Sequence, residues 1–145
     1  MWKNQQLVQG LVGWCYDQVN SNVRNYNDNE GAYLDGATDD AVLTNTQHVL
    51  RKYALNTMTT GSDPFQTYWD RNYRAIRNCN LFLKDRRGDK TKYVMVNSYW
   101  DKLMRDRLQG EAFALRAWFQ WDLLQKFGGE GTNGQMLGFP IITDV

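Results

Sequence analysis

Hydrophobic residues recur at spacings of three and four along three stretches of the chain, which predicts amphipathic helices. The first covers residues 3–24, with a stripe at Leu7, Leu11, Trp14, Cys15, Gln18 and Val19. The second covers 63–86, with a stripe at Phe65, Tyr68, Trp69, Tyr73, Ile76, Cys79, Asn80 and Leu83. The third covers 98–127, with a stripe at Trp100, Leu103, Met104, Leu108, Ala112, Leu115, Phe119, Leu123 and Phe127. An all-α fold is therefore expected.

Capping and turn residues mark where these helices end. Ser62 or Asp63 can cap the second helix, with Pro64 in its first turn, and Gly128-Gly129 predicts the end of the third. The run Thr38-Asp39-Asp40 predicts an N-cap and first turn for a short helix that begins at 41. Loops are expected at 25–40, 56–63 and 85–92, and a short extended segment at 138–142.

The second and third helices are joined by a short turn, which predicts an antiparallel hairpin and favours a helical-repeat architecture. Gly10 and Gly13 either weaken the first helix or mark a close approach by another helix. With 145 residues, the chain fits one domain.

Charge and composition exclude several classes of function. Lys and Arg number 17 against 16 Asp and Glu, which argues against a dedicated nucleic-acid binder. The basic excess of 70–92 is better explained as a solvated helix face. No apolar run approaches the ~20 residues of a membrane-spanning helix. Six Trp, eight Tyr, 13 Asn and ten Gln suit either sugar recognition or a helical core.

No residue pattern indicates catalysis, a metal or a cofactor. Cys15 and Cys79 lie far apart without a CxxC pair, so each is expected to be a small buried hydrophobe, and whether they pair is left open. His48 is the sole histidine, and no motif places a nucleophile beside it. Asp39 and Asp40 are better explained as capping residues than as a glycosidase pair. The acidic loop at 25–40 does not match an EF-hand.

Three motifs nevertheless occur in a distinctive order. Residues 68–80 (YWDRNYRAIRNCN) contain Trp69, Tyr73 and Asn80, residues 110–129 begin GEAFALRA with Glu111 and Arg116, and 138–140 read Gly-Phe-Pro. Upstream, Thr38-Asp39-Asp40 matches an S/T-D-[DE] element. The chain resembles the SusD/RagB family of outer-membrane nutrient-binding lipoproteins over about residues 5–143.

The resemblance implies an α-helical fold of degenerate tetratricopeptide-like helix pairs, of which 1–145 would be a single N-terminal domain truncated before the C-terminal region. It implies a non-catalytic protein that binds a glycan or another nutrient and works with a SusC-like TonB-dependent transporter. The location implied is the cell surface of the outer membrane, reached through a lipid anchor that this sequence lacks. The alternative function is a helical-repeat scaffold for a protein partner.

The resemblance also points to candidate site residues. Where starch-binding members have a stacking Trp and an Asn after the T-D-[DE] element, this chain has Leu43 and His48, so Asn45 and His48 are the candidate glycan contacts. From the residues themselves, Glu111 is expected to pair with Arg107, and Arg116 to tie neighbouring helices or cap backbone carbonyls. Trp118, Trp121 and Phe127 are expected to form an exposed apolar surface that drives self-association.

Overall fold

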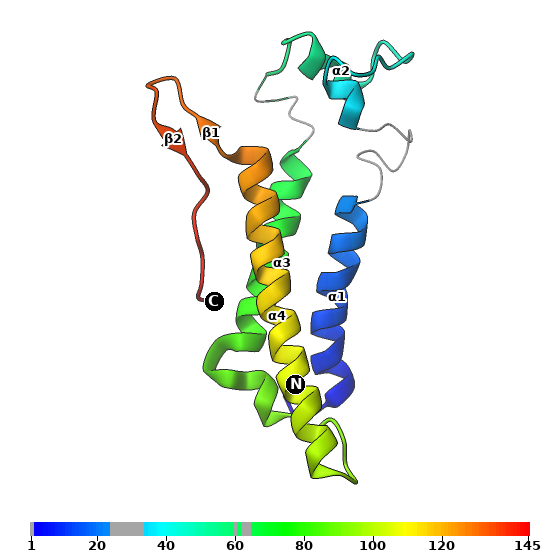
Figure 1. Cartoon of the computed structure of the whole chain (residues 1–145), viewed down its shortest axis with the longest axis vertical. Coiled ribbons are helices and arrows are strands. Elements are labelled where there is room, and N and C mark those ends of the chain that lie inside the picture. Colours follow the sequence, from blue (N-terminus) through cyan, green and yellow to red (C-terminus); the bar gives the residue numbers. More distant parts are fainter. Residues whose placement is uncertain (1, 24–33, 60, 62–64) are drawn as a thin grey trace.

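The computed structural model describes residues 2–23, 34–59, 61 and 65–145. Within these residues, three long helices lie side by side along the long axis of the molecule: α1 (Gln5–Val23), α3 (Gln66–Leu83) and α4 (Ser98–Phe127) (Figure 1). A 3-10 segment, η3 (Lys84–Lys90), connects α3 to α4, which runs in the opposite direction. The chain is mostly helical, so the all-α fold class and the predicted hairpin are confirmed.

Helix α4 begins and ends where the sequence predicts. The Oδ1 atom of Asn97 accepts hydrogen bonds from the backbone N–H groups of Tyr99 and Trp100, at 3.0 and 3.2 Å. These bonds satisfy N–H groups that have no partner inside the helix. At the other end, the N–H of Gly128 donates to the carbonyl of Leu124 at 2.9 Å. Local capping therefore fixes both ends of the longest helix.

The core is formed where the three helices meet, and its buried members are Val8, Val12, Cys15, Ala75, Ile76, Cys79, Phe82, Tyr93, Leu108, Ala112, Leu115, Phe119 and Leu123. Two of the predicted stripes are partly wrong. On α1, Leu7 is 57% exposed, because the helix turns Val8 and Val12 inward instead. On α4, Trp100 and Leu103 are exposed, because the first turns extend past the ends of the neighbouring helices (Figure 1).

The predicted helix at residue 41 is wrong. A 3-10 turn, η1 (Leu34–Ala37), comes first, and Thr38 closes it by donating its hydroxyl to the carbonyl of Asp35 at 2.8 Å. The short helix is α2 (Val49–Ala54), eight residues later than predicted. Ser62, Asp63 and Pro64, the predicted caps of α3, lie outside the described residues.

The chain turns back after α4. Strands β1 (Gly129–Glu130) and β2 (Met136–Leu137) form a two-stranded antiparallel sheet in which Gly129 pairs with Leu137. Residues 138–145, here called the C-terminal segment, then run beside α3 without regular secondary structure (Figure 1). None of the helices described in this structure has the length and the hydrophobicity that a membrane span requires.

Candidate functional site

The C-terminal segment is held against α3 by two polar side chains of the sequence motif. Tyr73 donates its hydroxyl to the carbonyl of Pro140 at 2.8 Å. Asn80, which is 1% exposed, donates to the carbonyls of Ile142 at 3.0 Å and Asp144 at 3.2 Å. From Pro140 the carbonyls bound by Asn80 are two and four residues away, which is ~6.6 to ~13.2 Å of extended chain, and the ~10.5 Å rise of the seven helical residues from Tyr73 to Asn80 lies between these lengths. The spacing of Tyr73 and Asn80 therefore matches the segment that they bind.

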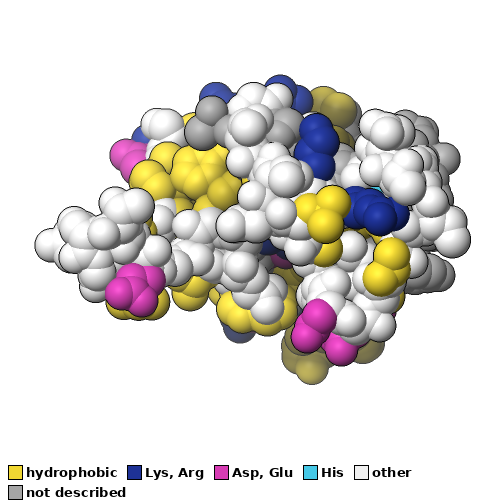
Figure 2. Space-filling model, turned by 90° about the horizontal axis from the view of Figure 1, so that it is seen from above, with side chains coloured by type: hydrophobic (Ala, Val, Ile, Leu, Met, Phe, Trp, Pro, Cys, Tyr) yellow, Lys and Arg dark blue, Asp and Glu magenta, His cyan; other side chains and the backbone are white. Residues whose placement is uncertain are grey.

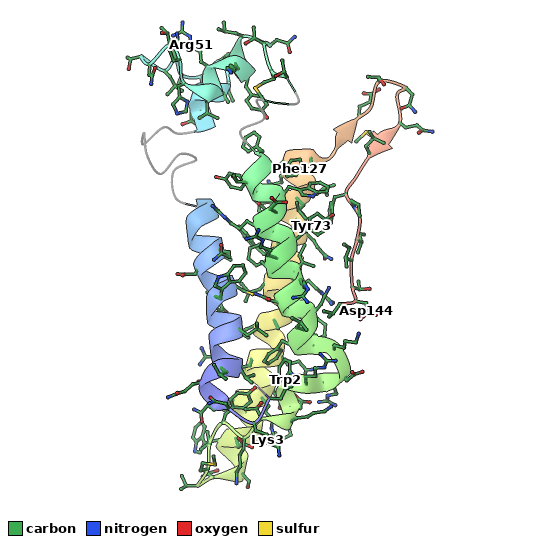
Figure 3. All side chains as sticks on the ribbon, turned by 180° about the vertical axis from the view of Figure 1, so that it is seen from behind. Trp2, Lys3, Arg51, Tyr73, Phe127 and Asp144 are labelled. Carbon is green, nitrogen blue, oxygen red and sulfur yellow. The ribbon has the colours of Figure 1, made fainter. Side chains whose placement is uncertain are left out.

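Two charged groups complete this attachment. Arg116 of α4 donates to Oδ1 of Asn80 at 3.0 Å, which leaves the Asn80 amide N–H groups directed at the segment. Lys84 forms an ion pair with Asp144 at 2.8 Å, and this contact, with the N–H of Val145, lowers the pKa of the Asp144 carboxyl. Figure 3 shows Tyr73 and Asp144 on the side of α3 along which the segment runs. The motif residues on α3 and α4 thus have a positioning role.

The remaining motif residues lie nearby or on the surface. Trp69 contacts the rings of Tyr73 and Phe127, with centroid distances of 4.9 and 5.0 Å. Glu111 forms an ion pair with Arg107 at 2.6 Å, and burial together with the nearby Glu111 carboxylate raises the pKa of Tyr16 on α1. The structure therefore brings Trp69, Tyr73, Asn80 and Arg116 together, whereas Glu111 stands apart from them.

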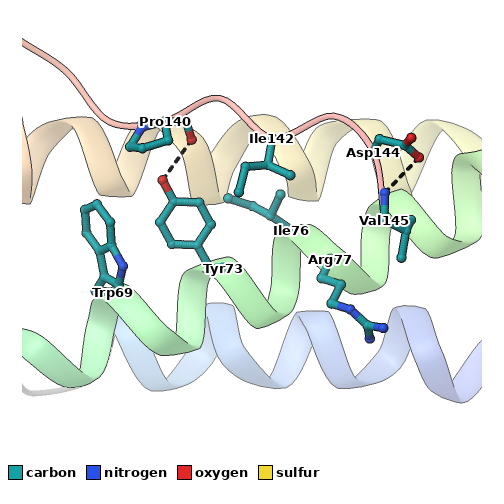
Figure 4. A pocket seen from close by; sticks show the side chains of 8 residues that line it. All are labelled: Trp69, Tyr73, Ile76, Arg77, Pro140, Ile142, Asp144 and Val145. Atoms are coloured by element: carbon teal, nitrogen blue, oxygen red, sulfur yellow. Dashed lines mark hydrogen bonds between the residues drawn. The ribbon is translucent and has the colours of Figure 1, made fainter.

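An apolar groove of about 430 Å³ opens between α3 and the C-terminal segment (Figure 4). Its lining residues are Trp69, Tyr73, Ile76, Arg77, Pro140, Ile142, Asp144 and Val145. The Tyr73 hydroxyl is already used by Pro140, and burial raises the pKa of this phenol, which keeps it a donor. The Asp144 carboxylate is held by Lys84. The groove thus offers mainly apolar surface and few polar atoms for a ligand.

A second, polar cleft of about 270 Å³ lies between α1 and α3. We call it the α1–α3 cleft, and its lining residues are Trp14, Gln18, Thr67, Asp70, Arg71 and Arg74. Trp14 is 37% exposed, so part of its indole is accessible. An accessible aromatic surface together with an amide, a hydroxyl, a carboxylate and guanidinium groups is a suitable combination for binding a small polar ligand. No motif in the sequence indicates this cleft.

The segment before α2 carries the two candidate glycan contacts in different environments. His48 is 4% exposed and is the N-cap of α2, where its Nδ1 accepts the N–H of Leu50 at 3.2 Å. Asn45 is exposed, and its Oδ1 accepts the N–H of Gln47 at 3.0 Å. Asp39 and Asp40 are exposed just after η1. His48 therefore stabilises the local backbone, whereas Asn45 lies on the surface.

Other polar groups are buried in the helix bundle itself. Cys15 and Cys79 are free cysteines with their Sγ atoms 3.8 Å apart, so they are buried neighbours. Asn72 donates to Oδ2 of the buried Asp122 at 2.6 Å. The other oxygen of Asp122 pairs with Lys126 one turn later on α4. In the described ranges, no group of three or more His, Cys, Asp or Glu side chains could hold a metal ion.

The three residues of the predicted apolar surface differ in exposure. Trp121 is 53% exposed, while Trp118 and Phe127 are half-buried and pack into the core. Seen from above, hydrophobic side chains reach the surface in separate groups, and Lys and Arg side chains are also separated from one another (Figure 2). This face has neither a single continuous apolar patch nor a basic stripe.

A comparison of the chain with protein families gives a match that includes the motif residues on α3 and α4. A family model described as SusD-like, starch-binding and associating with the outer membrane matches residues 2–145, which is nearly the whole chain. No curated protein and no solved structure matches the chain.

Proposed function

Because this chain belongs to the SusD-like family of starch-binding proteins that associate with the outer membrane, we propose that it binds glycans for uptake without chemically transforming them. The observation that carries this proposal is the family match over residues 2–145. We further propose that it works at the cell surface with a SusC-like TonB-dependent transporter, to which it delivers its ligand. A lipid anchor in the whole protein would hold it at the membrane.

The α1–α3 cleft supports a binding role, and we propose it as the glycan site. An indole can cover the apolar C–H face of a sugar ring, while the hydroxyl of Thr67 offers a hydrogen-bonding group for sugar hydroxyls. The volume of about 270 Å³ is just below the ~300 Å³ at the lower limit for ligand pockets. The cleft therefore suits one sugar unit of a longer chain, with neighbouring units exposed to solvent.

Isothermal titration calorimetry with soluble oligosaccharides tests the proposal. The panel contains starch-derived, pectin-derived and β-glucan-derived oligosaccharides, and at least one is expected to bind. Trp14→Ala is expected to weaken that binding, while Trp121→Ala, which removes an exposed indole on α4, is the matched control. Binding by none of the panel would overturn the glycan function, and equal effects of the two variants would exclude this cleft.

Asn45 remains the proposed second contact, because its amide lies on the surface. We propose that His48 contributes by fixing the start of α2 rather than by touching the ligand. Asn45→Ala is then expected to weaken glycan binding without changing the melting temperature, whereas His48→Ala lowers the melting temperature. An unchanged affinity in Asn45→Ala would remove this residue from the site.

A specific observation favours the alternative function, a scaffold for a protein partner. The first turns of α4 and the residues before them expose a group that we call the α4 tip: Met95, Val96, Tyr99, Trp100 and Leu103. Val96 is 96% exposed and Trp100 55%. A pull-down with a SusC-like transporter from the same organism separates the functions. Transporter binding that persists without any glycan binding would favour the scaffold.

A further inference from the structure

We infer that the α4 tip binds the surface of a lipid bilayer with anionic headgroups, its apolar side chains lying among the lipids and three neighbouring lysines against the headgroup phosphates. The family description associates these proteins with the outer membrane but assigns that contact to no residue. The inference goes beyond the proposed glycan function, because it gives the folded chain itself a contact with lipid, in addition to any lipid anchor of the whole protein.

The apolar side chains of the α4 tip form a projecting surface. Tyr99 and Trp100 lie four and three residues before Leu103, so the three are neighbours on the surface of α4. The rings of Tyr99 and Trp100 meet edge to face, with their centroids 5.5 Å apart. The tip extends past the ends of α1 and α3 (Figure 1). The six residues 98–103 rise ~9 Å, within the ~5–10 Å depth that interfacial helices reach in a bilayer.

Hydrogen bonds fix the shape of the tip before it meets a partner. Asp101 accepts the N–H groups of Tyr93 and Val94 at 2.6 and 2.9 Å, which ties the chain before α4 to the first turn of the helix. Asn97 caps the same turn. Little chain entropy is therefore lost when the tip binds a surface.

Three exposed lysines lie at the same end of the molecule as the tip. Lys90 ends η3, and Lys92 stands two residues further towards α4. Lys3 lies close to them, because Thr91 donates its hydroxyl to the carbonyl of Trp2 at 2.6 Å. Figure 3 shows Lys3 at the end of the molecule where α4 begins. The lysines and the apolar tip can therefore meet one surface together.

These lysines give this end of the chain a local excess of positive charge. Every acid within residues 84–107 is already in an ion pair: Asp85 with Arg87, Asp89 with Arg86, Asp101 with Arg105, and Asp106 with Lys102. In the part of the chain that the structure describes, no hydrogen bond or ion pair holds the side chain of Lys3, Lys90 or Lys92. The whole chain has a net charge of only +1, so the excess belongs to this end.

An anionic lipid surface satisfies both the apolar and the charged side chains. Trp and Tyr are enriched at the interface between lipid and water, because each has an apolar ring and a polar group. Lysine extends its apolar stem along such a surface and keeps its ammonium at the headgroups. A protein partner would need acids placed opposite each lysine, whereas a bilayer presents anionic groups over its whole surface. A lipid is therefore the partner that this composition favours.

Vesicle flotation tests the inference on the whole chain without an acyl group. One set of vesicles contains phosphatidylcholine alone, and in the other phosphatidylglycerol replaces part of it. Binding to the anionic vesicles is expected to be at least about tenfold tighter and to weaken as salt is added. The protein concentration is kept below that at which the sedimentation coefficient rises, so that self-association does not compete.

Two pairs of variants separate the charged from the apolar contribution. Lys92→Gln should weaken binding to anionic vesicles by about fivefold and leave binding to neutral vesicles unchanged. Lys52→Gln, which removes the same charge from α2 at the opposite end of the molecule (Figure 1), is its control. Trp100→Ala should weaken binding to both kinds of vesicle by about tenfold. Trp121→Ala, which removes an exposed indole further along α4, is the second control.

Fluorescence reports directly whether the tip enters the lipid. Vesicles with brominated acyl chains quench an indole that lies among those chains, so they are expected to quench part of the tryptophan fluorescence of the wild type. Trp100→Phe keeps a large apolar ring at the tip and should bind while losing most of this quenching. Circular dichroism confirms that each variant is folded.

Several outcomes would overturn the inference. Binding to neither kind of vesicle, equal binding to both, or equal effects within either pair of variants would each do so. Transporter binding that is lost in Trp100→Ala, in a protein that binds no vesicle, would assign the α4 tip to a protein partner instead. None of these results would affect the proposed glycan function, because calorimetry with oligosaccharides is carried out without lipid.

Discussion

Single polar side chains determine where the segments outside the three long helices lie. Asn80 and Tyr73 bind the C-terminal segment through its backbone carbonyls, and Asp101 binds the chain that leads into α4. His48 sets the start of α2. Buried polar groups need hydrogen-bond partners. Each of these side chains therefore holds the backbone of a neighbouring segment in one position, although the segment has few apolar contacts of its own.

Replacing Asn80 tests this role most directly. Asn80→Ala removes the donor to Ile142 and Asp144 and leaves the guanidinium of Arg116 without its acceptor. We expect a loss of about 1–3 kcal/mol in the free energy of unfolding, measured by urea denaturation. Amide hydrogen exchange in the C-terminal segment should also become faster. Asn78→Ala, a half-buried residue on the same helix, is the control, and an equal loss there would contradict the prediction.

Asp101 makes the stability depend on pH. Its carboxylate accepts the N–H groups of Val94 and Tyr93 at 2.9 and 2.6 Å and pairs with Arg105, and these contacts lower the pKa of Asp101 below its usual range. A carboxyl whose pKa is lowered by folding stabilises the protein above its unfolded pKa. This stability is lost as the pH falls through the lower, folded pKa.

Asp101→Asn replaces the carboxyl with a group that does not titrate, so it removes the part of the folding free energy that depends on the protonation of Asp101. Wild type is therefore expected to be more stable than Asp101→Asn near pH ~7, and the difference should shrink towards pH ~3. Urea denaturation at both pH values measures it. Asp106→Asn, an exposed acid on the same helix, should show a much smaller dependence, and a constant difference for Asp101→Asn would contradict the assignment.

The sequence indicates some of these residues but not their partners. Asn80 stands out in the motif at 68–80, yet its partners Ile142 and Asp144 are 62 and 64 residues away in the sequence. Hydrophobic periodicity predicts contacts within one helix and cannot predict hydrogen bonds between residues this far apart. Asp101 was missed, because a carboxylate in a first turn is equally consistent with a simple interaction with the helix dipole. A side chain that binds the backbone of a distant segment leaves no pattern in the sequence around it.

At the scale of elements, the α3–α4 hairpin follows from sequence because its stripes are long and its caps are local. The rotation of α1 does not. Val8 and Val12 are buried while Leu7 is exposed, because α1 carries apolar residues on more than one face and tertiary packing chooses among them. Gly10 and Gly13 mark no close approach, since a Cβ at either would meet no atom within 4 Å.

The contact between α1 and α3 protects their two thiols. Both thiols are buried, Cys15 at 1% and Cys79 at 2% exposed, which closes them to reagents in solution. The contact with Cys79 and burial also raise the pKa of the Cys15 thiol, so this thiol stays neutral. A thiol-specific disulfide reagent is expected to label neither cysteine in the folded protein and both after denaturation. Labelling of Cys15 in the folded state at the rate of a free thiol would show that α1 does not stay packed on α3.

Two glycines are expected to respond to substitution in opposite directions. Gly110 lies inside α4 with no atom within 4 Å of a built Cβ, so Gly110→Ala should raise the free energy of unfolding by about 0.5–1 kcal/mol. At Gly88, a Cβ would come within 2.3 Å of the Phe82 ring, so Gly88→Ala should lower it by about 1–3 kcal/mol. Urea denaturation measures both changes in the free energy of unfolding. An increase in Gly88→Ala as well as in Gly110→Ala would contradict the close packing of Gly88 in η3 against Phe82.

On the scale of the whole molecule, the bundle covers its helices unequally. The middle of α4 is buried, whereas its first turns extend past α1 and α3 (Figure 1). The α4 tip therefore exposes neighbouring large apolar side chains, and Trp121 adds another exposed indole further along the same helix. Clusters of this kind on a folded surface are typical of sites that bind another protein.

In the absence of such a partner, the α4 tip is expected to cause self-association. Burying one large apolar side chain contributes ~1.5–3 kcal/mol, so a few at an interface can offset part of the entropy cost of association. The sedimentation coefficient should then rise with protein concentration. The double variant Val96→Asp, Trp100→Ser should abolish this rise, because both residues are more than half exposed and serve no core contact. The control is Ile141→Ser, because Ile141 is an apolar residue of the C-terminal segment whose exposure of 71% lies between those of Val96 and Trp100. A rise that persists in the double variant would assign the association to another face, with Trp121 as the next residue to replace.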